Sequence, residues 1–310
     1  MTRAVEIDHL AKTYGRVRAV EDFSLTVDRG EIVALVGPDG AGKTTIFRAV
    51  CGLIDVDSGR ITVAGLDVAR EFDKVKAHLG YMPQVFSLYP DLSVEENLRF
   101  YAGLFGVGRA EFARKREVLY DFSGLGLFSG RRAGALSGGM KQKLSLSCAL
   151  VHDPEVLVLD EPTTGVDPVS RQQFWNILKD LKARGSAIAV ATPYMDEVAT
   201  SDRAVLVFQG RTLGAGTPAE LVRGFKGRVY RLDADANTDR FSERAHEIAR
   251  IQGLSHRRLG PSLYFYLGPG TSIRDYSERL AAAGVRAEAA EEIAPSLEDV
   301  FVQLMGEGAA

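Results

Sequence analysis

The chain has 310 residues, of which 45% are hydrophobic and 25% are charged. This composition excludes a disordered, collagen-like or disulfide-rich protein, and the length accommodates one large domain and a smaller one. The formal net charge of −3 and the pI near 6.0 show no basic excess, so nucleic acid is not an expected partner.

No run of the sequence predicts a membrane span. Apolar runs such as IVALV and AIAVA are only a few residues long, whereas a helix that crosses a membrane needs about 18 consecutive apolar residues. We therefore expect a cytoplasmic protein that meets the membrane only through a partner. The two cysteines, Cys51 and Cys148, lie in helix-like segments without a C-x-x-C pattern, which predicts buried free thiols.

The N-terminal segment predicts strands that lead into a helix. Residues 1–30 alternate apolar and polar side chains, with Gly15 and Gly30 at turns, as antiparallel strands do. The run EIVALV at 31–36 is short, continuous and β-branched, and a glycine-rich turn follows it. Because the next residues, TTIFRAVCGL, have helical spacing, the order here is strand, loop and helix.

The middle of the chain predicts a helical insert followed by more strands. Helical patterns dominate from about residue 85 to residue 150. The runs at 156–160, 186–192 and 203–208 are predicted to be buried strands, and helical segments separate them. Because strand and helix alternate, we expect a parallel sheet.

The last part of the chain has a different character. From about residue 226, polar-rich segments (RVYRLDAD, SLYFYL, VRAEAAEE) alternate with helical stretches and end in APSLEDVFVQLMG. We therefore predict a large α/β domain over residues 1–224, with its helical subdomain at about 85–150, and a small α+β accessory domain over 225–310.

A phosphate-binding loop is predicted between the strand at 31–36 and the following helix. The sequence here matches G-x-x-x-x-G-K-[ST]. Its residues are Gly37, Pro38, Asp39, Gly40, Ala41, Gly42, Lys43 and Thr44. Backbone N–H groups and the helix N-terminus surround the phosphates in such a loop. We expect Lys43 to reach the β- and γ-phosphates, Thr44 to bind Mg²⁺, and Thr45 to hold a further phosphate oxygen.

A second motif, VLVLDEP at 156–162, supplies two carboxylates. Asp160 and Glu161 end a buried strand, at the edge where ligands of open α/β sheets bind. Asp160 fits the carboxylate on the Mg²⁺ side, and Glu161 fits the general base that activates water. A solvated acidic pair would compete with this interpretation elsewhere, but not beside a phosphate loop.

LSGGM at 136–140 distinguishes between the many NTPase classes. It resembles the signature of ABC ATPases, and it stands between the other two motifs in the order of that family. The resemblance covers about residues 3–223 and implies a P-loop NTPase fold with an antiparallel β subdomain and a helical subdomain. It also implies a head-to-tail dimer, in which Ser137, Gly138 and Gly139 contact ATP held by the opposite subunit.

The same resemblance assigns further residues. Tyr14 would stack on adenine, Gln84 would contact Mg²⁺ and the attacking water, and Asp167 would lie in a loop between subunits. Each of these is, taken alone, equally explained as a surface or packing residue. Together with the motifs they predict Glu161, Gln84 and Lys43 as the catalytic residues, and ATP and Mg²⁺ as the bound cofactors.

Within this family, the chain most resembles bacterial export ATPases of the drug-efflux kind, which are encoded apart from their membrane subunits. The residues PSLEDVF at 295–301 extend the likeness into the tail, whose role would be dimer support or regulation. The implied partners are transmembrane permease subunits on the cytoplasmic face of the membrane. Phe86, Leu88 and Tyr89 could form the contact groove, or belong to an ordinary helical core.

One position departs from the family pattern. A histidine that contacts the γ-phosphate normally follows the strand at 186–192, but here Pro193 stands there. Proline has neither a side-chain donor nor an N–H. The chain could therefore hydrolyse ATP slowly, pair with a different ATPase subunit, or use ATP as a dimerisation switch. We favour the heterodimer over the homodimer.

Two other functions share some of these motifs. A soluble ABC ATPase that acts on ribosomes or DNA would carry two fused cassettes or a long coiled coil, and this chain has one uninterrupted cassette. A small-molecule P-loop kinase would have no use for LSGG. The cargo cannot be read from this chain, because the membrane subunits select it.

Overall fold

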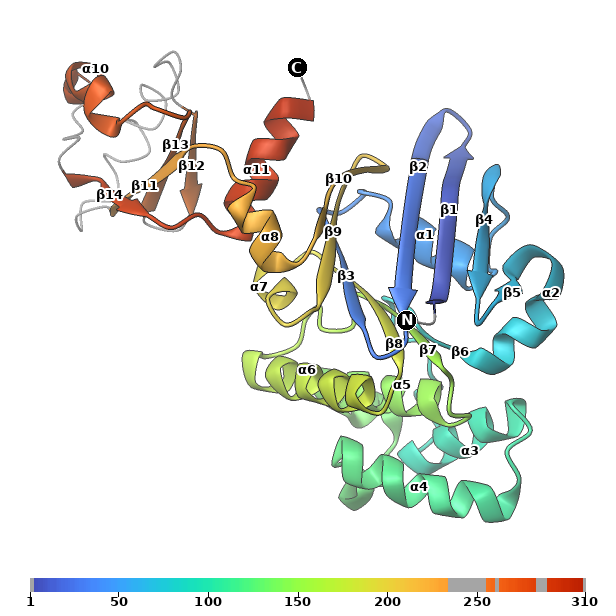
Figure 1. Ribbon diagram of the computed structural model, residues 1–310. Coiled ribbons are helices and arrows are strands. Elements are labelled where there is room, and N and C mark those ends of the chain that lie inside the picture. Colours follow the sequence, from blue (N-terminus) through green and yellow to red (C-terminus); the bar gives the residue numbers. More distant parts are fainter. Residues whose placement is uncertain (1–2, 234–254, 260–261, 283–288, 309–310) are drawn as a thin grey trace. The chain divides into compact units, whose positions relative to one another are not determined.

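The computed structural model describes residues 3–233, 255–259, 262–282 and 289–308. The chain forms two compact units, Met1–Pro218 and Ala219–Ala310, and both are drawn in Figure 1. Helix α8 (Pro218–Arg223) lies at the division. The boundary predicted between residues 224 and 225 stays a prediction.

An antiparallel sheet opens the first unit, in the order β2-β1-β4-β5. Its strands are β1 (Arg3–Tyr14), β2 (Val17–Asp28), β4 (Ser58–Val63) and β5 (Leu66–Asp67). Opposite each other on β1 and β2, Leu10 and Phe23 are fully buried. The alternation of residues 1–30 therefore predicts the first two strands correctly, because one face of the sheet is buried.

A second sheet has six strands in the order β10-β9-β3-β8-β7-β6. The phosphate loop and the Asp160–Glu161 motif lie at the ends of its strands. Its strands are β3 (Ile32–Val36), β6 (Leu79–Met82), β7 (Val156–Asp160), β8 (Ala187–Thr192), β9 (Arg203–Phe208) and β10 (Arg211–Gly216). The five strands from β9 to β6 are parallel. Four of them, β3, β7, β8 and β9, agree with the predicted strands, whereas β6 is not predicted from the sequence. The sixth, β10, is antiparallel to β9, because Gln209 and Gly210 connect the two strands as a hairpin too short for a crossover.

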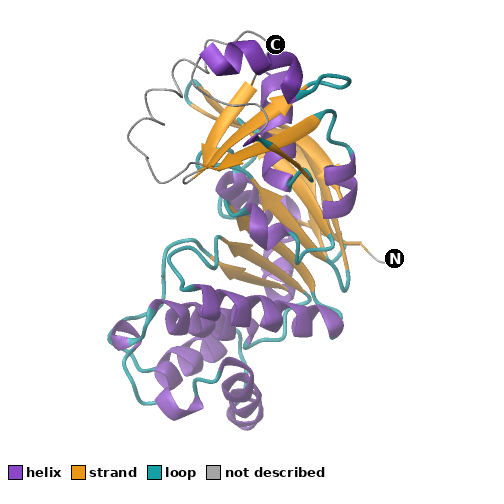
Figure 2. Cartoon of the chain, turned by 90° about the vertical axis from the view of Figure 1, so that its left-hand side faces the viewer, coloured by secondary structure: helices purple, strands orange, loops and turns teal. Residues whose placement is uncertain are grey.

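Helices cover both faces of this sheet. The helices of this unit are α1 (Lys43–Val50), α2 (Val68–Val75), α3 (Val94–Leu104), α4 (Arg109–Ser123), α5 (Gly138–Leu150), α6 (Pro168–Ala183) and α7 (Met195–Val198). Helices α3, α4 and α5 form the predicted helical insert, and in the turned view of Figure 2 helices gather below the strands of this unit. Among the described residues, no helix combines the length and apolarity needed to cross a membrane.

Alternate residues of the central strands face two separate cores. On one face, Val33, Leu35 and Val158 pack with α1 and the antiparallel sheet. On the other, Leu157 and Leu159 pack with helices α3, α5 and α6. Burial on both faces explains why these strands are continuous apolar runs rather than alternating ones. The sheet is therefore fixed from both sides, and its C-terminal ends are rigid supports for polar side chains.

The second unit contains an antiparallel sheet in the order β12-β13-β11-β14. Its elements are β11 (Arg228–Asp233), β12 (Ser255–Leu259), β13 (Ser262–Leu267), α10 (Ser277–Ala282), β14 (Glu291–Ile293) and α11 (Leu297–Gly308). Leu263, Phe265 and Leu280 are fully buried in its core. The α+β prediction agrees with these elements. The predicted segment VRAEAAEE lies partly outside the described residues.

The PSLEDVF run starts helix α11 through a reciprocal cap. The Ser296 hydroxyl accepts a bond from the N–H of Asp299 at 3.3 Å, and the Asp299 carboxylate accepts one from the N–H of Ser296 at 2.7 Å. The same carboxylate accepts a bond from the Tyr266 hydroxyl on β13 at 2.8 Å. The run therefore both starts the helix and joins it to the sheet.

Candidate active site

The phosphate loop connects β3 to α1 and is curled around its own lysine. The Lys43 side chain is buried, and its ammonium donates to the carbonyls of Gly37 at 2.8 Å and Pro38 at 3.1 Å. Gly42 has φ 106°, and a side chain at that position would lie 2.5 Å from the Ala19 carbonyl oxygen. Only glycine fits there, so the loop is shaped before any phosphate arrives.

Glu161, directly after β7, is held by side chains from three segments. Its carboxylate lies 3.3 Å from the Lys43 ammonium, accepts a bond from the Gln84 amide at 2.8 Å and accepts another from the Thr164 hydroxyl at 3.3 Å. The residue is 5% exposed and has φ 49°, which is a strained conformation for a side chain of this size. The structure thus brings the three predicted catalytic residues together.

Asp160 lies beside this group with unused acceptor capacity. It is fully buried, and its Oδ1 accepts a bond from the Thr44 hydroxyl at 3.2 Å. Its Oδ2 has no hydrogen-bond partner among the described residues. Burial raises the pKa of Asp160 above its ordinary value, although the bond from Thr44 opposes the change. A buried carboxylate with a free oxygen beside a hydroxyl suits a hard cation, so these residues fit Mg²⁺.

A cleft of about 480 Å³ gathers most of the predicted nucleotide-binding residues. They are Tyr14, Asp39, Gly40, Ala41, Gly42, Lys43, Thr44, Thr45, Gln84 and Glu161. Tyr14 is 46% exposed, so its ring is available for stacking. Sequence reasoning missed Arg18 and Gln209, which also line the cleft. Gln209 has φ 49° in the turn before β10, and only the Q-G pair signals that turn.

The LSGG residues lie at the N-terminal end of helix α5. Ser137 begins α5, and its hydroxyl accepts a bond from the N–H of Met140 at 3.4 Å. Gly138 and Gly139 follow in the first turn, where N–H groups lack intrahelical partners. None of these three residues is among those lining the cleft around the phosphate loop. Contact with a nucleotide held by another subunit therefore stays a prediction.

The departure from the family pattern lies at the end of β8. Pro193 follows Thr192, whose hydroxyl accepts a bond from the N–H of Tyr194 at 3.1 Å. The Tyr194 ring lies 4.3 Å from the guanidinium carbon of Arg171, on α6. No histidine is among the described residues that line the nucleotide cleft. The structure therefore offers no nearby imidazole in place of the missing one.

Comparison with known proteins decides the family. The family model "ABC transporter" matches residues 20–164. The Nod factor export ATP-binding protein I of Rhizobium etli is 33% identical over 311 residues, covering 98% of this chain and 93% of that protein. The chain belongs to the ATP-binding proteins of ABC transporters.

Two further relatives match this ABC ATPase. The "Probable multidrug ABC transporter ATP-binding protein YbhF" of Escherichia coli is 42% identical over 218 residues, which cover 70% of this chain but only 38% of YbhF. A solved ATP-binding subunit of an ABC transporter is 31% identical, with a TM-score of 0.65, and the match covers 71% of this chain and 92% of that one. The family likeness favours a transport ATPase over the ribosome- or DNA-directed alternative.

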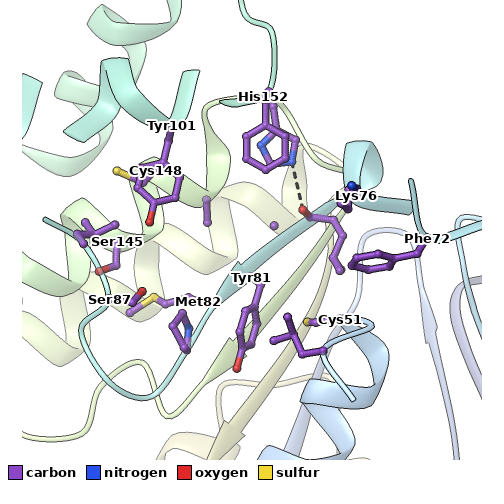
Figure 3. Close-up of a pocket in the computed structure, with 17 residues that line it drawn as sticks. Cys51, Phe72, Lys76, Tyr81, Met82, Ser87, Tyr101, Ser145, Cys148 and His152 are labelled. Atoms are coloured by element: carbon purple, nitrogen blue, oxygen red, sulfur yellow. Dashed lines mark hydrogen bonds between the residues drawn. The ribbon is translucent and has the colours of Figure 1, made fainter. Parts of the chain in front are cut away.

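An apolar pocket of about 200 Å³ lies between β6 and α5 of the ABC ATPase (Figure 3). Leu88 lines it, Phe86 packs on the neighbouring core, and Tyr89 is 47% exposed. A role of this segment in a permease contact stays a prediction. Cys51 and Cys148, also in the lining, are free and buried, and burial raises the pKa of both thiols.

The His152 imidazole stands at the rim of this pocket. It stacks on Phe105 at a centroid distance of 3.7 Å, and its Nε2 lies 3.2 Å from the Leu79 carbonyl oxygen, a bond drawn dashed in Figure 3. Burial lowers the pKa of His152, which favours the neutral ring. The pocket is therefore largely apolar, and Lys76 is the cation in its lining.

Proposed function

We propose that this ABC ATPase drives an exporter by binding Mg-ATP, closing a head-to-tail dimer and hydrolysing the nucleotide. The observation that carries the proposal is the convergence of Lys43 and Gln84 on Glu161, beside the free oxygen of Asp160. Export is favoured because the relatives are named for multidrug transport and Nod factor export. The cargo stays open.

The contacts of Lys43 suggest how ATP prepares the base. Before nucleotide binds, the ammonium is shared between Glu161 and the carbonyls of Gly37 and Pro38. The more highly charged phosphates compete for it and release the Glu161 carboxylate. Glu161 then takes a proton from water as the water oxygen bonds to the γ-phosphorus and the bond to the leaving ADP oxygen breaks. Thr44, Asp160 and Gln84 would hold Mg²⁺, which would neutralise charge on the phosphates.

The second ATPase subunit places LSGG opposite the phosphate loop. Each γ-phosphate then adds charge-assisted contacts to the facing Ser137 end, which only the closed dimer makes. We favour a heterodimer, because Pro193 removes one donor from this site and a complete partner site would restore turnover. The accessory domain at 225–310 would support the dimer or regulate it.

The apolar pocket in Figure 3 is a suitable surface for a permease subunit. Two exposed apolar side chains line it, Leu53 at 57% and Phe105 at 39% exposure. Val85, 75% exposed, lies in sequence between Pro83 and Ser87, which also line the pocket. An apolar patch of this kind marks a protein contact, and a short permease helix with apolar side chains would fill it. Val85 follows Gln84 directly, so such a contact would lie next to the catalytic group. The protein would therefore work on the cytoplasmic face of the membrane.

Phosphate release from the purified protein with Mg-ATP tests this function. Glu161→Gln keeps the side-chain shape and removes the base, and we expect it to lower turnover by about 10²- to 10⁴-fold. Tight ATP binding without turnover would support the heterodimer. Turnover near the median enzyme rate of about 10 s⁻¹ by the protein alone would contradict it, and transfer of phosphate to an acceptor would contradict the function itself.

A further inference from the structure

We propose that Glu197 is a positioning residue that ties the loop of the catalytic base to the segment containing Pro193. The inference rests on the hydrolytic role of Glu161 and adds a group that acts through other residues. Glu197 lies in α7, and its side chain is 2% exposed. A carboxylate so deeply buried needs full hydrogen bonding, because an unpaired one costs several kcal/mol, about 3 or more.

Two hydroxyls, one from the turn after β7 and one from the last residue of β8, satisfy this carboxylate. The Thr163 hydroxyl donates to Glu197 Oε1 at 2.5 Å, and the Thr192 hydroxyl donates to Oε2 at 2.6 Å. Both threonines are 1% exposed, so water does not replace either bond. One side chain therefore bridges the ends of β7 and β8 at the level where hydrolysis occurs.

A third segment joins the same carboxylate. Arg171, on α6, places its Nε 3.4 Å from Glu197 Oε1, an ion-pair distance. Its guanidinium also covers the Tyr194 ring. A terminal nitrogen of the same group lies 3.6 Å from the Asp196 carboxylate. Helix α6 begins at the Asp167 cap, so the loop that the family places between subunits is connected to this cluster.

The sequence positions of these groups explain what the cluster controls. Thr163 and the base-contacting Thr164 are adjacent, and Thr164 reaches Glu161 through both its N–H at 3.2 Å and its hydroxyl at 3.3 Å. Thr192 directly precedes Pro193. Small misplacements of a catalytic group lower the rate strongly. The Thr163 hydroxyl, whose bond to Glu197 holds the loop of Glu161, should therefore affect turnover without contacting the nucleotide.

A pair of substitutions at Thr163 tests this role. Thr163→Val keeps the shape and removes the hydroxyl, whereas Thr163→Ser keeps the hydroxyl. We expect the valine variant to lower kcat about tenfold with KM for ATP unchanged, since Thr163 does not line the nucleotide cleft. The serine variant should retain kcat. Equal kcat in the two variants, or a loss confined to KM, would overturn the proposal.

Hydrogen exchange tests the same link without turnover, and so separates it from the proposed function. In the complete protein without nucleotide, Thr163→Val should speed amide exchange at residues 192–198, about thirty residues away in sequence, and Thr163→Ser should not. Glu197→Gln, which keeps one acceptor oxygen, should give an intermediate increase. Faster exchange restricted to the loop around Thr163 would show that Glu197 does not connect the two segments.

Discussion

The two sides of Glu161 are built differently. On the phosphate-loop side, Lys43 and Gln84 contact the carboxylate itself. On the side of β8, the hydroxyls of Thr163 and Thr192 donate to Glu197 instead. A backbone bond from the Glu161 N–H to the Ala191 carbonyl joins the two sides. We therefore expect the first side to contact the carboxylate of the proposed base directly, and the second side to hold its loop in position.

The largest effect is expected on the first side. Lys43→Met removes the buried ammonium that contacts Glu161 and would meet the phosphates, so we expect ATP affinity to fall about 100-fold. A nucleotide-binding titration measures this. Lys74→Met is the matched control, because that side chain is 70% exposed on α2, and its affinity should equal that of the wild type. Unchanged ATP affinity in Lys43→Met would show that the Lys43 ammonium does not contribute to nucleotide binding.

Much of this first side can be predicted from sequence, because its chemistry is local. The phosphate loop needs glycines at fixed spacing, and Asp160 and Glu161 follow a strand whose apolar run is recognisable. Four of the five parallel strands and the helical insert follow from the same periodicities, whereas the short strand β6 does not. The order of the strands in the sheet and the hairpin that adds β10 do not, since both depend on pairing between distant segments.

The second side could not be predicted, because it depends on contacts between distant residues. Glu197 is one acidic residue in a short polar segment, and only the fold brings it to Thr163. Its environment is tertiary, so the sequence alone does not indicate that this acidic residue is buried. Asp299 is a similar case, since the sequence suggests the helix cap but not the bond from Tyr266.

A second substitution sharpens the comparison at Pro193. Pro193→His restores a side-chain donor on the β8 side, and one hydrogen bond to a charged phosphate would raise kcat about tenfold. Pro193→Ala is the control, because it removes the ring without adding a donor. Steady-state phosphate release distinguishes them. An equal gain in both variants would show that proline rigidity, rather than the missing donor, limits turnover.

The smallest expected effect concerns stability. Burial raises the pKa of Asp160, so the charged carboxylate opposes folding, and the free energy of unfolding falls as pH rises from the ordinary aspartate range through the raised pKa. Asp160→Asn does not titrate, and above that range it should be more stable than the wild type by about 1 kcal/mol without metal. This corresponds to a Tm increase of about 2–4 °C.

The Asp160→Asn advantage should shrink as the pH is lowered, and thermal unfolding measured across pH checks this sign. Asp73→Asn is the control, since its side chain is 95% exposed and a surface change alters stability by no more than about 0.5 kcal/mol. Added Mg²⁺ should stabilise the wild type and not the Asn variant, because only the carboxylate binds the ion strongly. A less stable Asn variant at neutral pH would contradict this prediction. It would mean that groups within the protein already stabilise the Asp160 charge without the metal.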